Sequence, residues 1–117
     1  METLASLVTF GSNIPLFTPA LPDPMPIEFP PEQLSANLKT AAKWLNFFDP
    51  DDALGYPLKP LSPSYGKTVS ADIEVNVGSW LTSWNPISHT EYWTDDNFTK
   101  PVAALIREVV AAGRTAQ

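Results

Sequence analysis

The stretch WLNFFDPDD at residues 44–52 decides the fold that this sequence predicts. Its first part, Trp44 to Phe48, is a short apolar run rich in aromatic residues, which is typical of a strand. The run stops at the acidic turn Asp49 to Asp52, where Pro50 removes a backbone donor and so disfavours continued pairing. The sequence therefore sets carboxylates directly after a strand.

Upstream, the segment Leu4 to Phe10 is a continuous apolar run, partly β-branched, that stops at Gly11 and Ser12. A run of this kind fits a strand buried on both faces, as in a parallel sheet. Between the two strands, the pattern of Glu32 to Lys43 predicts a short helix. Pro30 and Pro31 suit the start of this helix. The order strand, helix, strand predicts a parallel pair.

Downstream, residues 72–77 alternate, with one face apolar and the other formed by Asp72, Glu74 and Asn76. This period of two predicts a half-exposed strand at or near an edge of the sheet.

A final helix is expected over about Asp96 to Ala112, with Gly113 marking its end. Because Pro101 is tolerable only near the first turns, the regular helix is expected to begin nearer Thr99. Its apolar stripe has helical spacing and consists of Phe98, Val102, Leu105, Ile106 and Val109.

Proline is the unusual feature of the composition. All but Pro101 of the 13 prolines fall between Pro15 and Pro31 or between Pro50 and Pro86. Because proline fixes φ and removes a donor, we expect an excursion without regular structure at residues 13–31 and a second loop at 55–66.

Together these segments predict an α/β fold: a short, mostly parallel three-stranded sheet flanked by helices, in a single domain over residues 1–117. Such a sheet is narrow, and the Leu4–Phe10 strand would leave one edge unpaired. We therefore expect a homodimer or higher oligomer that covers this edge or the exposed face.

Composition excludes several function classes. The net charge of −6 and the scattered basic residues give no surface for nucleic acid. No apolar run approaches the roughly 20 residues that span a bilayer. With no cysteine and one histidine, we expect neither a metal site nor a cofactor. A cytoplasmic location is the default expectation.

Several motifs resemble, in their order, the C-terminal part of the esterase- and lipase-like α/β-hydrolases. The stretch LVTFGSNIPLF at 7–17 is similar to the strand and turn that follow their nucleophile helix, and NFFDPDD at 46–52 is similar to their acid-bearing turn. VNVG at 75–78, followed by SHTEYW at 88–93, resembles their last strand and histidine loop. The resemblance implies a truncated α/β-hydrolase fold.

The resemblance also implies roles for single residues. His89, the only histidine, stands where the family has its general base. Asp52, or else Asp49, stands where the family has the acid that orients the histidine, with Asp51 as a third choice.

The nucleophile has no equivalent position. The sequence has no G-x-S-x-G elbow, and Ser12, which follows a strand, is succeeded by Asn13, Ile14 and Pro15 rather than by a second glycine. Other serines, Ser79, Ser83 and Ser88, have no recognisable base in attack geometry.

The aromatic residues near His89 leave two interpretations open. Trp80, Trp84 and Tyr92 would line the pocket of a small ester or acyl substrate, or would pack the last helix against the sheet together with Trp93.

The expected function is that of a truncated serine-hydrolase-like protein with weak or no ester hydrolysis. The alternative is a non-catalytic module on the same scaffold that binds a protein or a small ligand.

Overall fold

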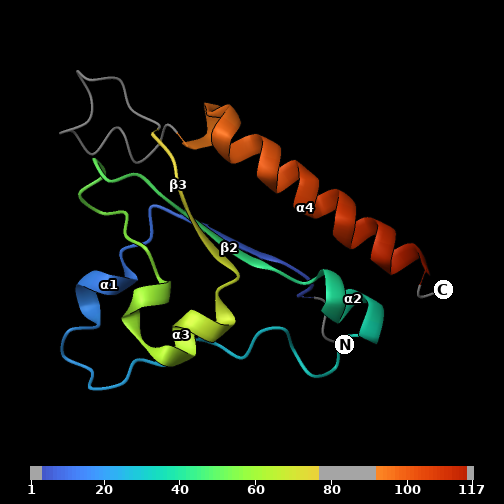
Figure 1. Cartoon of the computed structure of the whole chain (residues 1–117), viewed down its shortest axis with the longest axis horizontal. Helices are drawn as coiled ribbons and strands as arrows, with labels where there is room; N and C mark the ends of the chain where they lie inside the picture. Colours follow the sequence, from blue (N-terminus) through green and yellow to red (C-terminus); the bar gives the residue numbers. More distant parts are fainter. Residues whose placement is uncertain (1–3, 77–91, 116–117) are drawn as a thin grey trace.

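The computed structural model describes residues 4–76 and 92–115 of the 117-residue chain, and Figure 1 shows the arrangement of its elements. In chain order the elements are β1 (Leu7–Phe10), α1 (Ile14–Phe17), α2 (Ala36–Ala41), β2 (Trp44–Phe48), the 3-10 turn η1 (Lys59–Leu61), α3 (Pro63–Thr68), β3 (Ala71–Glu74) and α4 (Asp96–Thr115).

The three strands form one parallel sheet in the order β1-β2-β3. Thr9 is paired with Asn46, and Asn46 with Asp72, so one level of the sheet carries a polar residue on every strand. The predicted α/β class with a short three-stranded parallel sheet is confirmed, and the last strand lies at an edge as its alternation indicated.

Burial differs between the strands because, within residues 4–76 and 92–115, only β2 has a neighbouring strand on both sides. The residues of β2 are buried except for Phe48, and Phe47 is inaccessible to solvent. By contrast, every residue of β1 is only half-buried. The expectation that this strand would be buried on both faces is wrong, since an edge strand leaves one of its sides uncovered.

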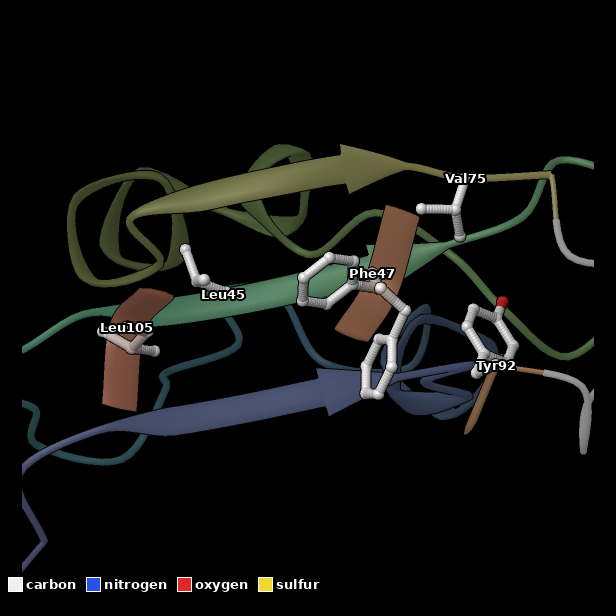
Figure 2. Packing of buried hydrophobic residues seen from close by; sticks show 6 residues of the cluster. Leu45, Phe47, Val75, Tyr92 and Leu105 are labelled. Atoms are coloured by element: carbon white, nitrogen blue, oxygen red, sulfur yellow. The ribbon is translucent and has the colours of Figure 1, made fainter. Parts of the chain in front are cut away.

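Helices cover both faces of the sheet. On one face, Leu45 and Phe47 of β2 share a core cluster with Phe98 and Leu105 of α4. Figure 2 shows Leu45, Phe47 and Leu105 in this cluster. On the other face, Trp44 packs in a second cluster whose other buried members are Phe29, Leu58, Tyr65 and Val69. Successive residues of β2 thus contribute to opposite cores, which is the normal consequence of the alternation along a strand.

The helix expected over Glu32–Lys43 is shorter in the structure. It begins after Ser35, which has extended backbone angles (φ −59°, ψ 154°) and accepts the N–H of Leu38 at its side-chain oxygen. This serine cap, rather than the preceding proline pair, starts α2, because the cap satisfies a donor that no helical carbonyl can reach.

The predicted loops contain short helical turns. Within 13–31 the turn is α1, and the predicted loop at 55–66 contains η1 and the start of α3. Proline lies in the first turn of each, where its missing N–H costs no hydrogen bond. Lys59 then stabilises the end of α3, since its Nζ donates to the carbonyls of Gly66 and Val69 at 3.0 and 2.8 Å.

The last helix is longer than expected. It begins at Asp96 rather than near Thr99, includes Pro101, and continues past Gly113 to Thr115. Its last turns lie beside α2, where Leu38 approaches Gly113 and Lys43 forms an ion pair with Glu108. These contacts stabilise the last turn of α4, which runs past Gly113, the residue that the sequence suggested as the end of the helix.

Candidate functional site

The candidate site lies at the carboxyl edge of the sheet, where parallel strands bring their ends together. Gly11 and Ser12 follow β1, the acidic turn follows β2, and Val75 follows β3. In open parallel sheets this edge is the usual place for ligands and catalytic groups.

The acidic turn is buried and held by its own hydrogen bonds. Asp49 is 1% exposed and Asp52 is 4% exposed, whereas Asp51 points into solvent. The Asp49 carboxylate accepts the N–H of Asp51 at 2.9 Å, and Oδ1 of Asp52 accepts the N–H of Leu54 at 2.9 Å. The two buried carboxylates therefore have a defined orientation before any ligand arrives.

Tyr92, which lies shortly before α4, connects the acidic turn to this part of the chain. Its hydroxyl oxygen accepts the N–H of Asp49 at 3.0 Å and its proton is donated to Oδ2 of Asp52 at 3.3 Å. The ring is inaccessible to solvent and packs against Phe10 and Phe98, with centroids 5.5 and 6.3 Å away. Figure 2 shows it at the carboxyl end of the strands.

The same surroundings determine the protonation of Tyr92. Burial raises the pKa of its phenol far above the ordinary value, and the negative charge of Asp52 raises it further. Because a buried phenolate beside a carboxylate is strongly disfavoured, the hydroxyl keeps its proton and remains a donor to Asp52.

Two glycines allow this close packing. Gly11 has φ 53°, a left-handed conformation that side chains rarely adopt. A Cβ on Gly55 would lie 2.9 Å from Oδ2 of Asp52, 3.1 Å from the Cα of Gly11 and 3.1 Å from the Tyr92 oxygen. The N–H of Tyr56 also donates to the carbonyl of Ser12 at 3.1 Å, so the turns after β1 and β2 are joined.

A second polar group lies on the opposite face of β2. Asp72 accepts the N–H groups of Leu58 and Lys59 at 2.9 and 2.8 Å, and Nδ2 of Asn46 at 2.8 Å. Asn46 in turn accepts the hydroxyl of Thr9 at 2.8 Å. These hydrogen bonds attach the segment after the acidic turn to β3. They also link the polar side chains of all three strands.

Sequence reasoning missed this network because the alternation of 72–77 assigned Asp72 to the solvent face. A signal was present in Asn46, the one polar residue inside the apolar run 44–48. A polar side chain in the middle strand of a sheet needs partners on its neighbours, and here the partners are Thr9 and Asp72.

The structure thus describes only some of the predicted site residues. The structure brings Asp49, Asp52 and Tyr92 together. The predicted base His89 and the predicted substrate-binding residues Trp80 and Trp84 lie outside the described residues, as do Ser79, Ser83 and Ser88. The catalytic role of the two aspartates and the substrate-binding role of Tyr92 stay predictions.

The described ranges 4–76 and 92–115 contain no group of three or more acidic, histidine or cysteine side chains that could hold a metal ion. Within the same ranges no helix is long and apolar enough to cross a membrane.

Comparisons with known proteins give no significant match to this chain among family models, curated sequences or solved structures.

Proposed function

We propose that this chain is a derivative of an esterase- or lipase-like α/β-hydrolase, with Asp52 as the acid of its site and His89 as the base. The observation that carries the proposal is the acidic turn: Asp52 is buried, oriented and placed directly after the middle strand of a parallel sheet. The resemblance in sequence implies this position for the acid.

The geometry of Asp52 suits the role of an orienting acid. Such a carboxylate must accept the N–H of the second imidazole nitrogen and stabilise the positive charge of the ring, which requires a fixed direction and a low local dielectric. Burial to 4% exposure lowers the dielectric around Asp52. Bonds from the Leu54 N–H and the Tyr92 hydroxyl fix the direction of its carboxylate.

The chain order also suits the proposal. His89 precedes Tyr92 by three residues, and three residues of extended chain span at most about 11 Å. Since Tyr92 contacts the acidic turn, this spacing is compatible with a histidine that reaches Asp52.

Weak or no hydrolysis is the expected activity of the chain by itself. A histidine and an acid act with a nucleophile as one unit, and removal of one member abolishes most of the rate. This sequence has no nucleophile elbow.

The test is labelling with a fluorophosphonate probe, together with turnover of a p-nitrophenyl ester by the purified chain. We expect slow turnover that His89→Ala and Asp52→Asn abolish. Asp51→Asn is the matched control, because Asp51 is exposed in the same turn and should leave turnover unchanged. Turnover that survives both His89→Ala and Asp52→Asn would contradict the assignment.

The second candidate is a non-catalytic module that binds a protein or a small ligand. The observation in its favour is the apolar surface of segment 14–27, where Leu16, Phe17, Leu21, Met25 and Ile27 are all exposed, Phe17 to 73%. A concentration of exposed apolar side chains in one segment favours an interaction site. No labelling and no turnover in the assay above would favour this candidate.

A homo-oligomer and a cytoplasmic location belong to both proposals. The homo-oligomer is supported by the outer edge of β1, with which no strand of the described residues pairs. The cytoplasmic location is compatible with the cysteine-free sequence, which suits a reducing compartment.

A further inference from the structure

We propose that Tyr92 is a positioning residue, whose hydroxyl fixes the orientation of the Asp52 carboxylate. The inference rests on the proposed function in one respect only, namely that Asp52 is taken as the acid of the site. The geometry on which it stands is independent of any activity.

The hydroxyl of Tyr92 makes two bonds of different kinds with one turn. It accepts the backbone N–H of Asp49 at 3.0 Å and donates to Oδ2 of Asp52 at 3.3 Å. Because the accepted N–H belongs to the backbone, the hydroxyl oxygen is fixed relative to the turn, and its proton then points at a single carboxylate oxygen. The other oxygen of Asp52 accepts the Leu54 N–H, so the carboxylate is held at both oxygens.

The ring carries this constraint into the core. Tyr92 is inaccessible to solvent and packs against Phe10 of β1 and Phe98 of α4. Its carbonyl accepts the N–H of Asp95 immediately before α4. The orientation of Asp52 is therefore coupled to the packing of the last helix on the sheet.

Gly55 shows that the space around the hydroxyl is closely filled. A Cβ at this position would lie 3.1 Å from the hydroxyl oxygen and 2.9 Å from Oδ2 of Asp52. Alanine would force one of the two partners to move, so Gly55→Ala disturbs their bond without removing any polar group.

The experiment measures amide hydrogen exchange by NMR in the whole chain. The decisive amide is that of Leu54, which bonds to Asp52 and has no hydrogen bond with Tyr92. In Tyr92→Phe, where the ring remains, we expect the Leu54 and Asp49 amides to exchange at least about tenfold faster, relative to the Phe47 amide in the same protein. Gly55→Ala should accelerate the Leu54 amide in the same way.

Tyr65→Phe is the matched control, because it removes a hydroxyl from a buried tyrosine in the cluster on the opposite face. It should leave both rates within about threefold of the wild type. An unchanged Leu54 rate in Tyr92→Phe would overturn the proposal, since the tyrosine would then act only through its ring and through Asp49.

A measurement on the unmodified chain covers the case in which the variants do not fold. The hydroxyl proton of Tyr92 should be visible as a slowly exchanging NMR signal near neutral pH, and its absence would equally overturn the proposal. These readouts are independent of ester turnover. A chain that shows these signals without turnover would favour the non-catalytic candidate and leave the positioning role standing.

Discussion

At the scale of single residues, the Asp72 carboxylate accepts three hydrogen bonds in the polar network of the sheet. It accepts two backbone N–H groups and the amide of Asn46. Asp72→Ala leaves these donors without their acceptor, and each buried unsatisfied group costs about 1–3 kcal/mol. We expect the free energy of unfolding, measured by urea denaturation, to fall by about 3 kcal/mol.

Glu74→Ala is the control for Asp72→Ala, because Glu74 is exposed on the same strand. It should change the free energy of unfolding by less than about 0.5 kcal/mol. Equal losses in the two variants would show that the network of Asp72 contributes no more than a surface carboxylate.

Tyr92 makes stability depend on alkaline pH. Burial raises the pKa of its phenol in the folded chain, so between the unfolded value near 10 and the higher folded value the folded state binds more protons. The contribution is fully present below pH of about 10 and is lost as pH rises further. We expect urea denaturation to show a steeper loss of stability above this pH for the wild type than for Tyr92→Phe.

Below pH of about 9, where the phenol is protonated in both states, the stability curves of the wild type and Tyr92→Phe should run parallel. Parallel curves above pH 10 as well would contradict the raised pKa.

At the scale of elements, two serine caps start two short helices in different surroundings. Ser62 is buried, accepts the N–H of Tyr65 at 3.2 Å and donates to the carbonyl of Pro24 at 2.7 Å. Ser35 caps α2 with a single bond of 3.4 Å in an exposed position. The first cap therefore also fixes the proline-rich segment 13–31 against α3.

Because of this difference, Ser62→Ala should lower the free energy of unfolding by about 2 kcal/mol, and Ser35→Ala by about 0.5 kcal/mol. Thermal and urea denaturation of the two variants provide the comparison. A larger loss for Ser35→Ala would mean that the bond to Pro24 contributes nothing.

At the scale of the whole molecule, the two edges of the sheet differ. One edge strand, β3, carries Asp72 and Glu74, whereas the other edge strand, β1, has no charged residue and no proline. Natural sheets usually protect an edge with such residues or cover it. The molecule is also flat, with extents of 49 × 36 × 20 Å and a radius of gyration of 15.5 Å, against about 13 Å for a compact domain of this length.

From these features we expect a dimer or higher oligomer at micromolar concentration, measured by size-exclusion chromatography with light scattering. Its dissociation on dilution should speed amide exchange at Val8 and Phe10, since the N–H groups of Leu7 and Gly11 already bond to the neighbouring strand on the inner side. A monomer throughout the concentration range would contradict the prediction.

Much of the fold follows from local pattern. The apolar run 44–48, the alternation of 72–77 and the helical stripe that includes Phe98 and Leu105 each lie within one segment, so the sequence alone determined three strands, a long last helix and their parallel order. The acidic turn was found in the same way, since Asp49 and Asp52 directly follow a strand.

Only the tertiary structure decided that Asp72 faces partners rather than water and that Tyr92 bonds to the acidic turn. These features depend on hydrogen bonds between distant residues: Thr9 with Asn46 is 37 positions apart, and Tyr92 with Asp52 is 40. No local periodicity records such pairs, because their geometry exists only after the sheet has formed and α4 has packed against it. The sequence thus determined where the acid stands, and the packing of the chain decided what holds it.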